Sequence, residues 1–246
     1  MSFVVVAACL AVQWFLNFGS APYQQNWVLH YVSWMRKQFS KLTEGHGLFG
    51  VVILVLPILI VVSILFTIVY HVLGHWGYSI FSLALLWYCI DVTELKSAPA
   101  NVSDVSVIFV SAYQKVFAIL FWYFIFGPVG LALYVSVHAL CVYFVKAGND
   151  AVELQKYFVL TRGVMDWVPV RLLGLSFALA GNFAAVFKEW MGKLFQGIVA
   201  DFNFVSACGS AAILSQGAQE AIALLQRTLL IWLVVMALAR IGIWIG

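Results

Sequence analysis

LFGVVILVLPILIVVSILFTIVYHVL, residues 48–73, is the clearest membrane signature in this sequence. It contains no formally charged side chain, and it exceeds the roughly 20 apolar residues that a helix needs to cross the hydrocarbon core of a bilayer. Pro57 lies inside the stretch, but neighbouring helices can supply partners for the backbone group that a proline leaves free in lipid. The stretch therefore predicts a membrane-spanning helix.

The whole chain has the composition of a membrane protein. Of its 246 residues, 64% are apolar and 9% are charged, and the mean hydropathy is +1.01. Soluble domains carry about 25% charged residues because their surface faces water, so this composition excludes a soluble fold, and it equally excludes a disordered chain. The net charge of +3 is too small and too dispersed for a nucleic-acid-binding surface. We therefore expect one integral membrane domain over residues 1–246.

Further apolar runs extend this prediction. After a short turn at Gly74–Gly77, the run Tyr78–Ile90 pairs with the first stretch as a helical hairpin. Residues 2–18 lack the basic start of a signal peptide and are expected to remain as a membrane segment. The remaining runs are residues 107–145, Trp167–Phe187 and Ile222–Ile245. Together the runs predict an all-α, polytopic helical membrane protein with roughly four to six membrane segments.

The run 107–145 is too long for one ordinary crossing. As a straight helix it would extend about 58 Å, nearly twice the thickness of the hydrocarbon core. Gly127-Pro128-Val129-Gly130 lies in its middle, and glycine and proline are where a helix breaks at least cost. The run either folds back as a hairpin at this Gly-Pro break or crosses as one strongly tilted helix.

Four polar segments separate the apolar runs, at residues 19–47, 91–106, 146–166 and 188–220. The first and the third are rich in lysine and arginine, and the positive-inside rule places both on the cytoplasmic side. A hairpin at the Gly-Pro break brings 146–166 back to the side of 19–47. A single tilted crossing would put 146–166 outside.

Polar side chains inside or beside apolar helices are costly in lipid, so they are the leading candidates for function. Asp166, Arg171, His138 and Asn182 are the main examples. Asp166 precedes Trp167-Val168-Pro169, a pattern typical of a helix start, and Arg171 would then lie in the first turn. Arg171 either pairs with Asp166 or binds an anionic group. We expect a pocket where the Gly127–Gly130 break approaches Asp166–Arg171.

The sequence offers no metal site. The four cysteines form no CxxC pair, and the pair His71 and His75 has zinc-ligand spacing without a third ligand nearby. The letters GHGLFG at residues 45–50 match a dinucleotide fingerprint, but no strand precedes them, so they predict no cofactor. We expect neither a metal nor a resident cofactor.

Two blocks of the sequence carry a family resemblance. They are AYQKVFAILFWYFIFGPVGLALY, residues 112–134, and MDWVPVRLLGLSFALAGNF, residues 165–183. Together they cover about a sixth of the chain and resemble the paired signatures of the AmpE and CobD/CbiB membrane protein family. The resemblance implies either of two activities. CobD/CbiB proteins use ATP to make cobinamide, attaching aminopropanol or its phosphate to a cobyric acid amide, whereas AmpE proteins are inner-membrane proteins linked to β-lactamase induction through peptidoglycan recycling.

The details of the two blocks are more similar to AmpE. Asp166 stands where the cobinamide enzymes have asparagine, and the second block continues into FALAGNF as AmpE-like chains do. After Tyr134 the family usually has arginine and, three residues later, asparagine, whereas this chain has Val135 and His138. Loss of that arginine removes a bidentate phosphate ligand, which argues against the ligase chemistry.

The resemblance thus implies an AmpE-like regulatory or signalling protein of the bacterial inner membrane, and more a binding protein than an enzyme. An ATP-dependent cobinamide ligase is the alternative, with ATP as its only cofactor, and a small transporter of cell-wall fragments is a third reading. The expected partners are the lipid bilayer and a peptidoglycan-derived or other anionic small molecule, with no nucleic acid. No catalytic residue is assigned. The candidate ligand-binding residues are Gly127, Pro128, Gly130, Tyr134, His138, Asp166, Trp167, Pro169, Arg171 and Asn182.

Overall fold

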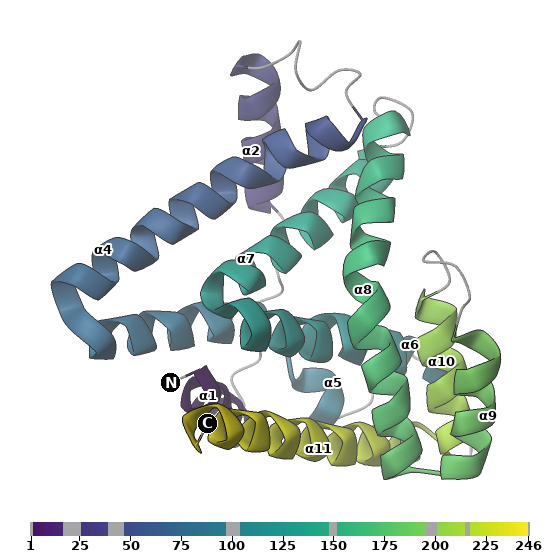
Figure 1. Ribbon diagram of the computed structural model, residues 1–246. Helices are drawn as coiled ribbons and strands as arrows, with labels where there is room; N and C mark the ends of the chain where they lie inside the picture. The colour runs from purple at the N-terminus through teal and green to yellow at the C-terminus, as the bar shows by residue number, and fades with distance from the viewer. Residues whose placement is uncertain are drawn as a thin grey trace.

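The fold was analysed in a computed structural model that describes residues 2–16, 26–38, 47–96, 104–147, 152–194, 201–214 and 217–245. Every regular element within these ranges is helical, which confirms the all-α prediction (Figure 1). The elements are α1 (Ser2–Leu16), α2 (Asn26–Gln38), α4 (Gly47–Cys89), α5 (Thr93–Lys96), α6 (Val105–Ala112), the π-helix η1 (Tyr113–Phe117), α7 (Ala118–Ala147), α8 (Val152–Ala180), α9 (Phe183–Lys193), α10 (Asp201–Ala212) and α11 (Ala218–Ile245). Residues 17–18 of the expected amino-terminal membrane segment lie outside the described residues.

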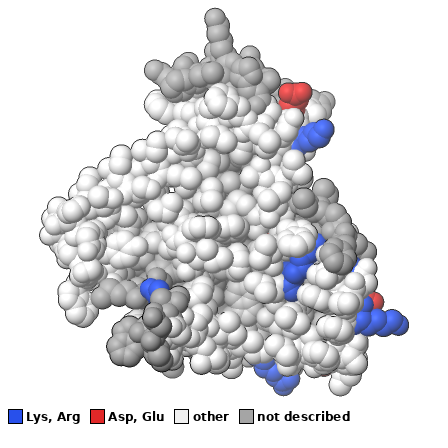
Figure 2. All heavy atoms as spheres, in the orientation of Figure 1, with Lys and Arg blue, Asp and Glu red and all other residues white. Residues whose placement is uncertain are grey.

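Four helical stretches are long and apolar enough to cross a membrane, which confirms a multi-pass membrane protein. They are Gly47–Cys89, Val105–Lys146, Val152–Ala180 and Ala218–Gly242. The first arm of α4 exposes one continuous apolar face, formed by Leu56, Ile60, Ile64 and Ile68, each 46–56% exposed. In Figure 2 the surface over α4 carries no charged atom, and charged side chains gather toward the other side of the molecule. An apolar face of this extent needs lipid or another chain to cover it.

Two of these helical stretches are bent sharply at a glycine. Gly74 in α4 has φ 65° and ψ −157°, and Gly127 in α7 has φ 64° and ψ −149°. This backbone region is essentially reserved for glycine, because a Cβ atom collides with the neighbouring carbonyl group. Figure 1 shows that each helix consequently forms a V of two arms. The break expected at Gly127 and Pro128 is confirmed, and so is the hairpin at Gly74.

Packing between the arms holds both bends closed. In α4, Phe66 of the first arm lies 5.4 Å from the ring of Tyr78 and 5.0 Å from the ring of Phe81 in the second arm. In α7, a Cβ atom on Gly130 would lie 2.3 Å from the carbonyl oxygen of Trp122. The two arms are therefore so close at this position that only the hydrogen atom of a glycine fits between them. Both bends are therefore supported by tertiary packing as well as by glycine.

The bend in α7 brings the start of α8 back beside the start of α4. A Cβ atom on Gly47 would lie 3.0 Å from the ring of Tyr157, and one on Gly50 would lie 2.7 Å from Leu154 (Figure 1). This is the arrangement that the hairpin predicted, and the run 107–145 is not one straight helix. That this end faces the cytoplasm stays a prediction.

Helix α8 is the central element of the fold. The helices α7, α9, α10 and α11 all pack against it. A Cβ atom on Gly174 would lie 2.8 Å from the ring of Phe204 and 3.3 Å from the sulfur of Cys208, which shows how closely α10 approaches. Since α8 begins at Val152, the expectation of a helix start at Asp166 is wrong, and Asp166 and Pro169 lie inside the helix.

Candidate functional site

A buried group of polar side chains lies between η1, α7 and α8. Asp166 is 1% exposed, and its Oδ1 accepts a hydrogen bond of 2.7 Å from the hydroxyl of the fully buried Tyr113. The Nε of Arg162 lies 3.5 Å from the other carboxylate oxygen of Asp166. Tyr134 and His138 complete the group. We call these five residues the polar cluster.

The local structure of each helix explains how these side chains meet. Arg162 and Asp166 are four residues apart on α8, the spacing that puts two side chains on one helical face. Tyr113 opens the π-helix η1, and single π turns inside longer helices occur frequently at functional sites. The carbonyl group of Lys115 within η1 accepts a hydrogen bond of 3.3 Å from the backbone nitrogen of Asp91, which occupies an acceptor at this irregular turn.

The second arm of α7 contributes the other side of the cluster. Tyr134 and His138 are four residues apart and share a face, with ring centroids 6.1 Å apart and ring planes inclined by 30°. Both side chains interact electrostatically with Arg162, and Tyr134 also with Asp166. The cluster thus joins side chains from three successive parts of the chain into one interior site.

Several polar atoms of the cluster have no hydrogen-bond partner among the described residues. They are Nδ1 of His138 and Nε and Nη2 of Arg162, whereas the hydroxyl of Tyr134 interacts with Asp166 and Tyr113. A buried polar group without a partner costs about 1–3 kcal/mol, and native proteins contain few of them. Arg162 and Asp166 balance each other in charge, but the remaining donors of Arg162 are left over. The cluster can therefore donate hydrogen bonds to the acceptor atoms of a further group.

Arg171 does not join this cluster, although pairing with Asp166 was one of the two roles expected for it. Its Nη1 donates to the carbonyl oxygen of Trp167 at 3.0 Å, and its Nε donates to that of Leu194 at 3.2 Å. Its guanidinium carbon lies 4.5 Å from the ring centroid of Trp167 and 5.2 Å from that of Phe204. Five residues rotate a helix by about 500°, which puts Arg171 about 140° away from Asp166. Arg162 takes the expected place of Arg171.

Asn182 has a structural position at a turn between helices. It is exposed, and its side-chain oxygen accepts a hydrogen bond of 3.3 Å from the backbone nitrogen of Ala185 at the start of α9. Its own backbone nitrogen donates to the carbonyl oxygen of Ala212 at 3.1 Å. The expected apolar run Trp167–Phe187 is therefore divided here, and Asn182 caps α9 instead of lying within a membrane helix.

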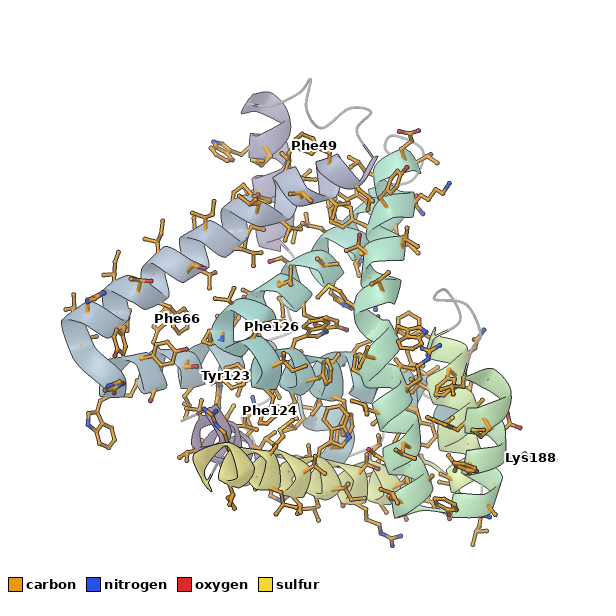
Figure 3. All side chains as sticks on the ribbon, in the orientation of Figure 1. Phe49, Phe66, Tyr123, Phe124, Phe126 and Lys188 are labelled. Atoms are coloured by element: carbon orange, nitrogen blue, oxygen red, sulfur yellow. The ribbon has the colours of Figure 1, made fainter. Side chains whose placement is uncertain are left out.

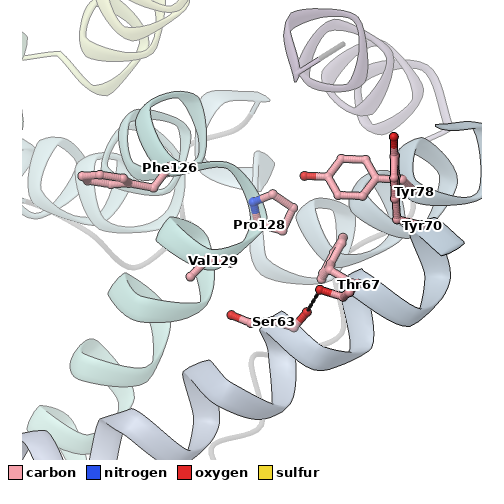
Figure 4. Close-up of a pocket in the computed structure, with 8 residues that line it drawn as sticks. Ser63, Thr67, Tyr70, Tyr78, Phe126, Pro128 and Val129 are labelled. Carbon is pink, nitrogen blue, oxygen red and sulfur yellow. Dashed lines mark hydrogen bonds between the residues drawn. The ribbon is translucent and has the colours of Figure 1, made fainter. Parts of the chain in front are cut away.

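Gly127, Pro128 and Gly130 lie at the bend of α7, where Pro128 lines a separate cavity of about 290 Å³. The opposite wall is α4, which contributes the hydroxyl-bearing side chains Ser63, Thr67, Tyr70 and Tyr78 (Figure 4). A pocket was expected at this break, and one is present. Its other wall is α4, however, and the expected Asp166–Arg171 segment does not line it.

The structure thus distributes nine of the ten predicted site residues over three places. Tyr134, His138 and Asp166 belong to the polar cluster; Gly127, Pro128 and Gly130 lie at the bend; Trp167, Arg171 and Asn182 lie toward α9 and α10. Pro169 is buried within α8. Sequence reasoning missed Tyr113 and Arg162, although the spacing of Arg162 and Asp166 was visible.

Metal-binding geometry is not evident in the part of the chain that the structure describes. Across the described ranges, no three His, Cys, Asp or Glu side chains gather as metal ligands do. The ionic centre of the site is instead a single carboxylate and a single guanidinium. The donor set suits an organic or inorganic anion better than a cation.

Comparisons with protein-family models, with curated proteins and with solved structures gave no match for this chain. The fold and the site nevertheless define a class. The chain is an all-α, multi-pass membrane protein with two glycine-bent helices and a buried polar cluster between η1, α7 and α8.

Proposed function

We propose that this chain is an AmpE-like regulatory protein of the bacterial inner membrane whose polar cluster binds an anionic small molecule, such as a peptidoglycan-derived fragment. One observation carries the proposal. The two blocks that resemble the AmpE and CobD/CbiB family, residues 112–134 and 165–183, meet at the polar cluster. Tyr113 of the first block donates a hydrogen bond to Asp166 of the second, across 53 positions of sequence.

The chemistry of the cluster supports an anionic ligand. The side chain of Arg162 is 12% exposed, and its Nη2 has no hydrogen-bond partner among the described residues. A guanidinium is a planar fork of donors that suits carboxylate and phosphate groups. Nδ1 of His138 is a further unpartnered polar atom among the described residues, and the Tyr134 hydroxyl lies in the same cluster beside Asp166. These groups together can bind one carboxylate or phosphate.

The cluster also has a state without a ligand, in which Asp166 is the counterion of Arg162. In this state the carboxylate of Asp166 lies 3.5 Å from the Arg162 side chain and is itself held by the Tyr113 hydroxyl. A bound anion would compete with Asp166 for the guanidinium. Because Tyr134 and His138 are on α7 while Arg162 is on α8, occupancy of the cluster favours a different packing of these two helices. Such a shift is how a regulatory membrane protein reports a ligand.

A deletion strain complemented with variants tests this proposal. We expect deletion to alter β-lactamase induction or muropeptide handling, the wild-type gene to restore it, and Arg162→Gln to fail. Lys156→Gln is the matched control, because Lys156 is an exposed basic residue on the same helix. Arg162→Lys separates charge from bidentate geometry and should restore only part of the response.

The amount of each variant in the membrane fraction decides how the result is interpreted. Full complementation by Arg162→Gln would overturn the proposed role of the cluster. Loss of cobamide synthesis in the deletion strain, restored by this gene alone, would instead favour the cobinamide ligase. Uptake of a labelled muropeptide into proteoliposomes that contain only this protein would favour the transporter.

A further inference from the structure

We infer that the cavity between the two helix bends binds an uncharged lipid, whose oxygen-bearing head enters the cavity while its tail stays in the bilayer. This site is separate from the polar cluster and does not depend on the function proposed for it. The cavity lies between the first arm of α4, the start of its second arm, and the bend of α7 (Figures 1 and 4).

Hydroxyl groups on one wall give the cavity its capacity for hydrogen bonds. Thr67 donates to the carbonyl oxygen of Ser63 at 2.8 Å, as the dashed line in Figure 4 marks. The hydroxyls of Tyr70 and Tyr78 also line the cavity, and neither forms a hydrogen bond with a described residue. These two phenols are therefore free to bind an oxygen atom of a ligand.

None of the residues that line the cavity is charged. His71 and His75 pack against the ring of Tyr70, with centroid distances of 5.8 Å and 5.1 Å, but they do not line the cavity. Helix α4 contains no Asp, Glu, Lys or Arg anywhere along Gly47–Cys89. The wall from α7 consists of Phe126, Pro128 and Val129, which are apolar. A phosphate or ammonium group placed here would lose its hydration without gaining a partner of opposite charge. The lining therefore selects an uncharged head.

The borders of the cavity face the bilayer. Phe126, which lines the cavity, is 60% exposed, and Ile68, next to the lining residue Thr67 in the chain, is 56% exposed. Both belong to helical stretches apolar enough to cross a membrane. Figure 3 shows Phe66 between the two arms of α4 and Phe126 at the bend of α7. At about 290 Å³ the cavity is at the lower end of the range for small-molecule sites. It is large enough for a head group but not for a lipid tail, and the exposed apolar face of α4 continues from its mouth.

Both bends hold the cavity in shape before any ligand arrives. Tyr78 packs edge to face on Phe66 and on Tyr70, with centroid distances of 5.4 Å and 6.3 Å. A Cβ atom on Gly127 would lie 3.7 Å from the Tyr78 hydroxyl, so the glycine that permits the bend also leaves room beside that hydroxyl. A site that is formed in advance binds with a smaller entropic cost.

Photolabelling of the full chain in phosphatidylcholine nanodiscs tests the inference. The probe is a diacylglycerol with a diazirine close to its glycerol, and mass spectrometry locates the label. We expect labelling of residues 63–78 and 126–129. Tyr78→Phe removes one hydroxyl and should reduce the labelling about fivefold. Tyr88→Phe is the matched control, because Tyr88 is an exposed tyrosine of the same helix outside the cavity, and it should label as wild type.

Two further measurements complete the test. Thr67→Leu fills the cavity while the outer face of α4 stays unchanged, so it should abolish the label at 126–129. A phosphatidic acid probe with the same chains should not label the cavity. Undiminished labelling of Thr67→Leu, or equal labelling by phosphatidic acid, would overturn the inference. Thermal unfolding of each variant in detergent verifies that the compared proteins are folded.

Discussion

The two halves of α8 each bury an arginine, but they surround it differently. In the amino-terminal half, Arg162 lies beside a carboxylate and 4.8 Å from the centroid of the Phe202 ring, and it retains donors without a partner among the described residues. In the carboxyl-terminal half, Arg171 donates to two backbone carbonyl groups, and aromatic rings lie next to its guanidinium. A buried guanidinium is therefore not by itself a ligand site. The donors that remain after folding distinguish a binding role from a structural one.

Asp166→Asn should have the largest effect on stability. It leaves Arg162 as a buried charge without a counterion, and removal of one partner of a buried ion pair typically costs about 3 kcal/mol or more. The free energy of unfolding in detergent, measured by denaturant titration, checks this value.

The double variant Asp166→Asn/Arg162→Gln is the control for the first prediction. Because it removes both charges, it should recover part of the lost stability, with a coupling of at least about 1 kcal/mol. Additive losses from the two single variants would mean that the pair contributes nothing as a pair, and the two halves of α8 would then be more alike than their contacts indicate.

Arg171→Leu should have the next largest effect, a loss of about 2 kcal/mol, because it removes hydrogen bonds to two carbonyl groups and a cation–π contact. The regulatory response of a complemented strain should remain. Trp190→Phe removes a hydrogen bond of 2.9 Å to the carbonyl oxygen of Arg171 and should cost about 1 kcal/mol. Loss of the response in an abundant, stable Arg171→Leu protein would transfer the binding role to this half of the helix.

Asn182→Ala should have an effect as small as that of Trp190→Phe, a loss of about 1 kcal/mol through the missing cap of α9. Asn182→Asp keeps a capping oxygen and should be near wild type. Neither substitution should change the regulatory response, since Asn182 is exposed at the turn after α8. A change in response with unchanged stability would restore Asn182 as a ligand residue.

The bends could be predicted from the sequence because length and composition agree there. The run 107–145 exceeds the thickness of the bilayer, and the one place with glycine and proline together is where the helix breaks. The start of α8 could not be found in the same way. Lys156 and Glu153 gave the segment before Asp166 a polar character, yet Leu154 and Phe158 beside them are buried. The segment is an amphipathic helix, and composition alone made it resemble a loop.

The site was predictable only in part. Because the segment before Asp166 was expected to be a loop, Arg162 was not expected to share a helical face with Asp166, four residues away. Tyr113 is a different case. It is one of 10 tyrosines, and it lies in an apolar run with nothing that singles it out. Its contact with Asp166 spans 53 positions and depends on how three elements pack. Local patterns can predict a helical pair, but they cannot predict a tertiary hydrogen bond.

The sharp turns at Gly74 and Gly127 also bear on how the chain enters the bilayer during synthesis. A bent helix can insert as a hairpin of two arms, so that only its apex has to cross to the far side of the hydrocarbon core. Residues 63–80 and 120–132 around the two apices contain no formally charged side chain, so this passage avoids the largest cost of membrane insertion. The lysines and arginines of the neighbouring segments need not be translocated. Each glycine bend thus lowers the free-energy cost of inserting a chain that must cross the membrane many times.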